Sequence, residues 1–392
     1  MQVVIIGNGI SGITVARTLR QHRSNIKITM YTDEPYPYYP RPRLYDVLSA
    51  HATPEAILSF TNEWYHEHGI DIQLNTKVAT IDPSQQLIRL DSGTLVSYDH
   101  LVLSMGAGPF VPSISGVNRP GVFTLRTLHD ALQIRRYMQT GGHATVIGGG
   151  LLGLEVAVAL TKIGQQVQVI EMLPHLLPRQ LDSKGAMLLK QHIESYGIHI
   201  TLGTQVHQIK GQTSVSGILL DNGHYLPSSL VLISAGIRPN LEIAQKAGIK
   251  AQKGIIVDSW LQTSNDRIYA CGNVAEFQGQ VYETIPAAIE QATHTAKSIL
   301  KIDRDRYHGT TLTHTLQIAG LSLTSLGVVN PEDTSYDVFT KTDNRHGVYK
   351  KLVLKQGILV GAIILGDKKS ITPIRTWMNK TVTSTMIPAL LN

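Results

Sequence analysis

Hydrophobic and polar positions at the start of the chain follow a strand–helix–strand order. The apolar run VVII (3–6) precedes a glycine-rich turn, GNGISG (7–12), and the next ten residues place apolar side chains at helical spacing. A second strand, IKITMY (26–31), runs into the acidic pair at 33–34. This order predicts a β-α-β unit of the kind that binds a dinucleotide.

The same order recurs farther along the chain, between residues 144 and 171. The strand ATVI is followed by GGGLLG (148–153), an apolar helix and the strand VQVI, which ends at Glu171. A single glycine motif is weak evidence, but two complete units in one chain predict two dinucleotide-binding domains.

The first glycine turn has the features that a pyrophosphate requires. Gly7 makes the tight turn, Gly9 lets the backbone approach the ligand, and Gly12 lets the helix pack close to the strand. Free N–H groups and the positive end of the helix dipole favour a phosphate at the helix start. Glu34 is expected to accept hydrogen bonds from ribose hydroxyls. The candidates at the helix start also include Ile10 and Ser11.

Glu171 bears on the choice of the second cofactor. A carboxylate at the end of this strand favours a free ribose 2′-hydroxyl and repels a 2′-phosphate, so NADH is predicted in preference to NADPH. The glycine turn of the second unit supplies the other candidates, which are Gly148, Gly150, Leu151, Leu152 and Gly153.

Three further apolar strands end in small residues. They are YDHLVLSMGAGP (98–109), LVLISAGIRPN (230–240) and a strand that ends in IYACGN (268–273). We expect the residues at these ends to border the two nucleotides, and the candidates are Ala107, Gly236, Gly272 and Asn273.

These motifs occur in the order seen in the pyridine nucleotide–disulfide oxidoreductase superfamily, which the chain resembles strongly over residues 1–300. Within that superfamily, EPYPYYPRPRLYDVL (34–48) looks most like the rubredoxin reductase branch, which also resembles the flavin-binding part of NADH-dependent nitrite reductases. The stretch 349–367 is similar to the tail of the same branch.

The resemblance implies that FAD binds the first unit and NADH the second. It implies that the proline-rich segment lines the flavin through Arg41, Pro42 and Arg43, with one of the two arginines near the pyrophosphate. It also implies that Ala288 lies at the start of a helix whose positive end faces the flavin pyrimidine. Asn273 stands where the superfamily usually has Asp, a departure that bears on FAD affinity rather than on cofactor identity.

The presence of a single cysteine limits the reactions that the protein can catalyse. Thiol-dependent members of the superfamily carry a reactive cysteine in the region matched here by 37–47, whereas Cys271 lies in a strand and is expected to be a buried, inert side chain. Electrons should therefore leave the flavin directly. Glu155, soon after the second glycine turn, is the candidate for orienting the nicotinamide; a plain surface glutamate is the alternative.

Charge excludes one class of partner and suggests another. The net charge of +6 comes without a dense Lys/Arg run, so no nucleic-acid partner is expected. Much of the excess lies in 309–392, where Lys350, Lys351, Lys368 and Lys369 suggest a docking surface for an acidic electron carrier. A solvated basic face is the alternative.

Other features argue against further sites. His66 and His68 point apart on a helix, and no metal site is predicted. The apolar run 357–366 is too short for a membrane span, so a buried strand or a hairpin is expected. The chain begins directly with a strand, which predicts no signal peptide, and the single cysteine favours a cytoplasmic location.

We therefore predict an α/β protein with two Rossmann-like domains and a small α+β C-terminal domain. The FAD domain takes residues 1–110 and 240–308, the NAD domain 111–239, and the C-terminal domain 309–392. The predicted function is electron transfer from NADH through FAD to an external acceptor, a small carrier protein such as rubredoxin. A peroxide-forming NADH oxidase and a non-turnover FAD/NAD-binding redox subunit are the alternatives. The sequence leaves open whether the protein is an oligomer.

Overall fold

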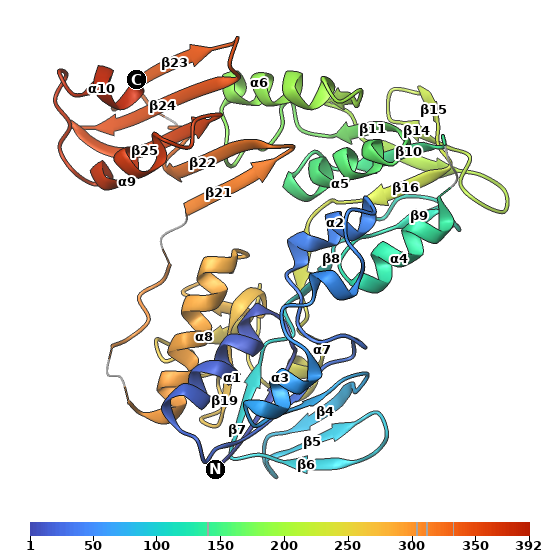
Figure 1. Cartoon of the computed structure of the whole chain (residues 1–392), viewed down its shortest axis with the longest axis vertical. Helices are drawn as coiled ribbons and strands as arrows, with labels where there is room; N and C mark the ends of the chain where they lie inside the picture. Colours follow the sequence, from blue (N-terminus) through green and yellow to red (C-terminus); the bar gives the residue numbers. More distant parts are fainter. Residues whose placement is uncertain (139–140, 303–304, 311–312, 332) are drawn as a thin grey trace. The chain divides into compact units, whose positions relative to one another are not determined.

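The computed structural model describes residues 1–138, 141–302, 305–310, 313–331 and 333–392. The chain forms two compact units, and each contains segments that are far apart in sequence (Figure 1). Unit 1 comprises Met1–Arg43, Thr53–Gly108 and Ile237–Thr311. Unit 2 comprises Leu44–Ala52, Pro109–Gly236 and Leu312–Asn392.

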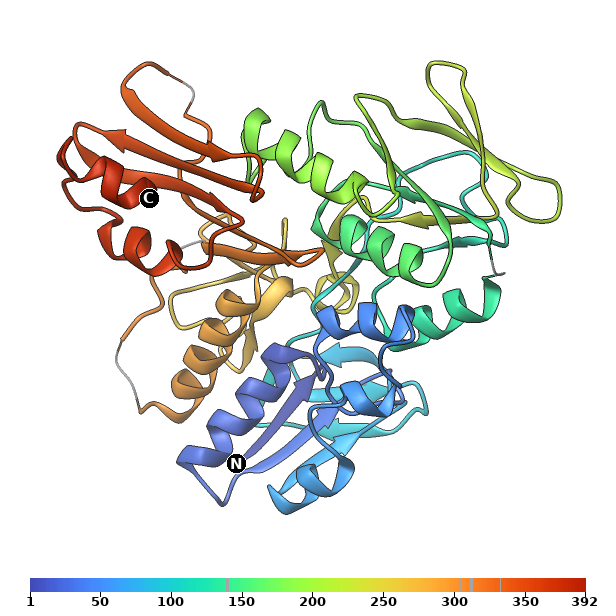
Figure 2. The same cartoon turned by 45° about the horizontal axis from the view of Figure 1, so that its top comes forward.

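Unit 1 is built on a five-stranded parallel sheet in the order β19-β7-β1-β2-β3. The bounds are β1 (Gln2–Ile6), β2 (Lys27–Tyr31), β3 (Ile70–Gln73), β7 (His100–Leu103) and β19 (Ile268–Ala270). Helices α1 (Ile10–His22) and α8 (Ile285–Leu300) lie side by side in Figures 1 and 2. The four residues Val3–Ile6 of the central strand β1 are apolar and buried, as expected for a parallel strand that is covered on both faces.

Smaller elements complete unit 1. An antiparallel sheet contains β4 (Val78–Asp82), β5 (Leu87–Leu90) and β6 (Leu95–Ser97). Two further pairs join β18 (Ile255–Val257) to β20 (Ala275–Phe277), and β8 (Ala107–Pro109) to β17 (Ile237–Pro239). The remaining helices are α3 (Asn62–Glu67) and α7 (Glu242–Lys246).

The first part of unit 2 repeats this plan. Its parallel sheet has the order β12-β11-β10-β16-β9, in which β10 and β11 take the places of β1 and β2. The strands are β9 (Val122–Phe123), β10 (His143–Ile147), β11 (Gln166–Glu171), β12 (His199–Leu202) and β16 (Leu230–Ile233). The helices are α2 (Leu44–Leu48), α4 (Leu128–Tyr137), α5 (Leu151–Lys162) and α6 (Ser183–Glu194). An antiparallel sheet of β13 (Val206–Lys210), β14 (Gly217–Leu220) and β15 (Tyr225–Pro227) follows β12.

The second part of unit 2 is an antiparallel sheet in the order β21-β22-β25-β24-β23. Its strands are β21 (Thr313–Ile318), β22 (Leu321–Gly327), β23 (Tyr336–Asp343), β24 (Val348–Lys355) and β25 (Ile358–Leu365). Helices α9 (Ile371–Trp377) and α10 (Ile387–Leu391) bury apolar side chains against β24 and β25. The apolar run 357–366 is thus largely β25, a buried strand as predicted.

The predicted α/β class with two Rossmann-like sheets and an α+β C-terminal part is confirmed. The division into four segments at 110, 239 and 308 stays a prediction, since the two units group the chain more coarsely. Across the described residues, no helix combines the length and the apolar character needed to cross a membrane.

Candidate cofactor sites

The first glycine turn leaves space for a ligand at one glycine and none at another. Gly12 is closely covered, because a Cβ there would lie 2.0 Å from the carbonyl oxygen of Gly7. Gly9 is the N-cap of α1, no side chain caps the helix there, and a Cβ at Gly9 would meet nothing within 4 Å. The first N–H groups of a helix lack intrahelical partners, so this end can receive an anion.

Glu34 lies where the predicted ribose contact should be, just beyond β2. Its carboxylate forms an ion pair with the Arg41 guanidinium and accepts a hydrogen bond from the Tyr39 hydroxyl. The guanidinium also lies over the Tyr39 ring, 4.7 Å from its centroid. The structure therefore brings together two predicted residues, Glu34 and Arg41. Pro42 and Arg43 complete the 3-10 helix Arg41–Arg43 and are exposed.

Asn8, inside the first glycine turn, is a site residue that the sequence analysis missed. Its side chain is buried, Oδ1 accepts a hydrogen bond of 3.0 Å from the Tyr65 hydroxyl, and Nδ2 has no partner among the residues that the structure describes. The Tyr65 oxygen also accepts a hydrogen bond of 3.2 Å from the Tyr38 backbone N–H. A buried donor without a partner is costly, so Nδ2 is suited to a ligand bound at this turn. The glycine motif gave no signal for this position because any residue fits there.

The predicted residues at the end of β19 lie close to the first turn. Gly272 has φ +77°, and a Cβ there would lie 2.1 Å from Ser11 Oγ and 3.8 Å from Ala288 Cβ. Its N–H donates to Gln291 Oε1 on α8 across 2.8 Å. Asn273 follows in the 3-10 helix Gly272–Val274, and Ile10 begins α1. Ala107 is buried in β8, at the end of the chain segment that leaves β7.

The second glycine turn has the same design as the first. A Cβ at Gly153 would lie 2.0 Å from the Gly148 carbonyl oxygen, whereas a Cβ at Gly150 would meet nothing within 4 Å. Gly150 is the N-cap of α5, whose first residues are Leu151 and Leu152, and no side chain caps this helix. Gly236, near the end of β16, also has open space at its Cβ position. This end of α5 therefore offers the same kind of anion site as α1.

Glu171 differs from Glu34 in what holds it. Its Oε2 accepts a hydrogen bond of 2.7 Å from the Gly149 N–H, and its Oε1 accepts one of 2.8 Å from the Leu173 N–H. Backbone groups therefore fix the carboxylate beside the glycine turn, whereas a guanidinium neutralises Glu34. A carboxylate held in this place repels a second anion that lies close to it.

Glu155 is half-buried on α5 rather than a plain surface residue. Its Oε1 accepts a hydrogen bond of 3.0 Å from the Ala319 N–H, between β21 and β22. Burial raises the pKa of Glu155, the Ala319 N–H and Lys162 oppose this, and Asp46 adds to it. Burial raises the pKa of Tyr45 on α2, and the Glu155 carboxylate raises it further. Tyr45, near the end of the proline–tyrosine segment, thus lies near the Glu155 carboxylate.

Cys271 is fully buried at the end of β19. Burial raises the pKa of its thiol to about 12, and the nearby Thr295 hydroxyl opposes this shift. A neutral thiol is a poor nucleophile and redox partner, so this side chain is inert at ordinary pH.

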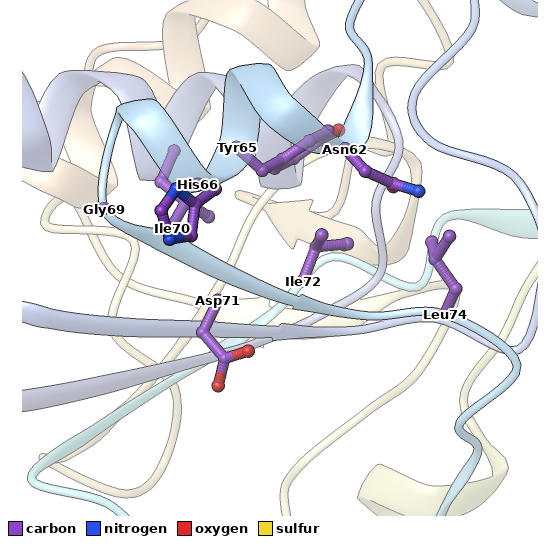
Figure 3. Close-up of a pocket in the computed structure, with 8 residues that line it drawn as sticks. All are labelled: Asn62, Tyr65, His66, Gly69, Ile70, Asp71, Ile72 and Leu74. Atoms are coloured by element: carbon purple, nitrogen blue, oxygen red, sulfur yellow. The ribbon is translucent and has the colours of Figure 1, made fainter.

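A cavity of about 590 Å³ lies on unit 1, between α3 and β3. Figure 3 shows Asn62, Tyr65 and His66 extending from the helix above the strand, and Asp71 on the opposite side of the strand from Ile72. The residues that line it include none of the predicted cofactor contacts. Over the described residues no group of three or more His, Cys, Asp or Glu side chains could hold a metal ion.

The prediction that four lysines form a basic docking surface is wrong for two of them. Lys350 and Lys351 are only 2% and 6% exposed. Lys350 Nζ lies 2.7 Å from Asp367 Oδ2 and donates to Ser370 Oγ, while Lys351 Nζ lies 2.9 Å from Asp182 Oδ2. Both ammonium groups are used inside unit 2 and cannot steer a partner. Lys368 and Lys369 are exposed.

Comparison with known proteins identifies the family. Residues 1–292 match the family model of the pyridine nucleotide-disulphide oxidoreductases, and residues 313–382 match that of the rubredoxin NAD+ reductase C-terminal domain. The chain therefore belongs to the pyridine nucleotide-disulphide oxidoreductase family.

Three similar proteins illustrate the range of relatives. An assimilatory nitrate reductase electron transfer subunit from Bacillus subtilis (strain 168) is 34% identical over 371 residues, 94% of this chain and 48% of that protein. A rubredoxin-NAD(+) reductase from Pseudomonas putida is 32% identical over 76% of this chain and 80% of that protein. The crystal structure of a ferredoxin reductase from Rhodopseudomonas palustris has a TM-score of 0.87 and 28% identity, and covers 97% and 96% of the two chains. The chain spans about half the length of the nitrate reductase subunit.

These matches confirm the predicted superfamily and, with it, FAD and NADH as cofactors. The residues present fit both groups. Open space above Gly9 and Gly150, uncapped helix starts beside them and the unpartnered Asn8 Nδ2 are what two pyrophosphates would use. Which residue makes each contact stays a prediction.

Proposed function

We propose that the chain takes electrons from NADH through FAD and delivers them to a small electron-carrier protein such as rubredoxin. The observation that carries this proposal is the burial of Cys271, the one cysteine of the sequence, because the flavin then has no accessible thiol to reduce and its electrons must leave for an external acceptor. The names of the Pseudomonas putida and Rhodopseudomonas palustris proteins support a carrier of the rubredoxin or ferredoxin kind. We place the protein in the cytoplasm, where NADH is available.

Each cofactor has a proposed set of contacts. Gly7, Gly9, Gly12 and Asn8 hold the FAD pyrophosphate with Ile10 and Ser11, and Glu34 binds the adenosine ribose. The segment Arg41–Arg43 and the residues Ala107, Gly272, Asn273 and Ala288 border the rest of the cofactor. Glu171 binds the NADH ribose, and the turn from Gly148 to Gly153 holds its pyrophosphate, with Gly236 alongside. FAD supplies the ability to accept a hydride and release its electrons one at a time.

The protein groups bind and orient rather than transfer protons. Glu155 orients the nicotinamide. The start of α8 favours negative charge on the flavin pyrimidine, because helix N-termini carry partial positive charge. Hydride transfer depends on distance and alignment more than on acid–base chemistry, so no general base is required.

Steady-state assays separate this proposal from its alternatives. The purified protein with FAD should oxidise NADH repeatedly with ferricyanide, and should reduce rubredoxin or a ferredoxin faster than it consumes oxygen. Rapid peroxide formation with no carrier reduction would favour an NADH oxidase. FAD and NADH binding without turnover would favour a non-turnover redox subunit. A protein that retains no FAD would contradict all three.

A further inference from the structure

Three side chains converge on one residue of the C-terminal sheet: one from α5, one from α6 and one from the segment just after α6. The Ala319 N–H donates to Glu155 Oε1 across 3.0 Å. Its carbonyl oxygen accepts a hydrogen bond of 2.7 Å from the Tyr196 hydroxyl and lies 3.0 Å from His192 Nε2. Both polar groups of this one residue are therefore held by side chains that lie more than a hundred positions away in sequence.

The turn that presents Ala319 has an unusual backbone. Ile318 pairs with Leu321, so Ala319 and Gly320 form a two-residue loop, and both have positive φ, 51° and 82°. Glycine or asparagine is favoured at the first of these positions, whereas alanine adopts it only at a cost. Such a conformation persists where the surroundings fix it. The contacts with Glu155, His192 and Tyr196 are those surroundings.

Glu155 is left with one oxygen for a ligand. Oε1 is taken by the Ala319 N–H, and no described residue donates a hydrogen bond to Oε2. The side chain is half-buried on the second turn of α5, whose start carries the open glycine turn. Fixing one carboxylate oxygen also fixes the direction of the other, because the group is planar.

We propose that the β21–β22 turn supports the NADH site by holding Glu155, and that Tyr196 and His192 act through this turn as positioning residues for Glu155. Glu155 Oε2 would then accept a hydrogen bond from the nicotinamide carboxamide, the only part of NADH with an N–H₂ group near the reacting ring. This inference rests on the proposed use of NADH and adds a role for the C-terminal sheet. It predicts that the sheet influences hydride transfer without touching the nucleotide.

The test removes the two donors to the Ala319 carbonyl oxygen while keeping an aromatic ring at each position. Tyr196→Phe and His192→Phe, made separately, should each slow flavin reduction by NADH about 3–10-fold in anaerobic stopped-flow traces, the effect of losing one hydrogen bond. The Kd for ADP-ribose, which has no nicotinamide, should stay unchanged. Tyr225→Phe is the matched control, because its hydroxyl donates to the Ser216 carbonyl across 2.7 Å on β15 of the same unit.

A double-mutant cycle distinguishes positioning from general loosening. In a Glu155→Gln background, Tyr196→Phe and His192→Phe should have little further effect on flavin reduction. Equal losses in both backgrounds, an unchanged reduction rate in both single variants, or a parallel weakening of ADP-ribose binding would overturn the inference. Failure of the wild-type protein to reduce its flavin with NADH would instead contradict the proposed function. Thermal melts establish that each variant is folded before its rate is compared.

Discussion

The Lys351 ammonium lies 2.9 Å from Asp182 Oδ2, and Asp182 is also the N-cap residue of α6. The same carboxylate accepts a hydrogen bond of 2.6 Å from the Tyr349 hydroxyl, and its other oxygen accepts one from the Gly185 N–H. Burial alone would raise the pKa of Asp182, but these hydrogen bonds and Lys351 lower it. One ionised carboxylate thus joins strand β24 of the C-terminal sheet to a helix of the NAD-binding part of unit 2.

Loss of either buried lysine should destabilise unit 2. Lys350→Met and Lys351→Met keep the apolar stem but leave Asp367 or Asp182 without its cation, which costs about 3 kcal/mol when one partner of a buried pair is removed. Lys368→Met is the matched control, because Lys368 is exposed on the same sheet domain. Urea unfolding followed by circular dichroism should give lower midpoints for the first two variants only. Equal midpoints for all three would show that the ion pairs add nothing to stability.

Carrier reduction should depend on the lysines that remain exposed. Neutralising Lys368 and Lys369 together should lower kcat/KM for an acidic carrier and leave reduction of a neutral quinone intact, since long-range attraction affects association rather than chemistry. The kcat/KM for the carrier should also fall between about 0.01 M and 0.1 M salt, because the Debye length shrinks from about 30 Å to about 10 Å. A carrier rate indifferent to salt and to both lysines would move docking elsewhere.

Local features of the site could be predicted from the sequence, and distant pairings could not. The two glycine turns follow from residues that are adjacent in the chain, and Gly9 and Gly150 have the open approach that the motif implies. The burial of Lys350 and Lys351 was missed because each ammonium group finds a carboxylate from another segment. Adjacent residues of a strand point to opposite faces, and both faces of β24 are covered.

The same limit explains two other findings. Asn8 meets Tyr65, which lies 57 positions away, and Glu155 meets Ala319, which lies 164 positions away. No spacing rule relates such residues, because the fold alone brings them together. Glu155 could be singled out by its place after a glycine turn, but its fixed orientation could be seen only in the structure.

Glu171 should control the choice between NADH and NADPH. Glu171→Gln removes the charge that repels a 2′-phosphate, and its single carbonyl oxygen keeps an acceptor for only one of the two N–H groups, of Gly149 and Leu173, that the carboxylate binds through separate oxygens. The preference for NADH over NADPH, measured as the ratio of kcat/KM values, should shrink by about 1–3 kcal/mol. Glu171→Arg should shift the ratio further. A ratio unchanged in both variants would mean that Glu171 serves only the turn.

Cys271 should be chemically silent in the folded protein. Because its pKa is raised to about 12, the thiol stays protonated at pH 8–9, and iodoacetamide should label it only after unfolding. Cys271→Ala should keep most NADH-dependent activity, and the reduced wild-type protein should show no long-wavelength thiolate–flavin band. Rapid labelling of the native protein by mass spectrometry, or activity lost in a folded variant that binds FAD, would contradict this.

Substitutions at Gly9 and Gly12, in the first glycine turn, should distinguish an effect on cofactor binding from an effect on folding. In Gly9→Val the added Cβ enters space where no atom of the described residues lies within 4 Å, and the residue has φ −84° and ψ −173°, which valine readily adopts. The apoprotein should therefore melt as the wild type does, while FAD affinity falls on the order of 10-fold or more, the cost of overfilling a packed contact. Gly12→Ala should instead lower the melting temperature of the apoprotein, because its Cβ would lie 2.0 Å from the Gly7 carbonyl oxygen and must disturb the fold. Any loss of FAD affinity in this variant would follow from that disturbance. Melting of the apoproteins and fluorescence titration with FAD measure the two effects separately. If Gly9→Val binds FAD as tightly as the wild type, the pyrophosphate does not approach this turn, and the first cofactor site must lie elsewhere in unit 1.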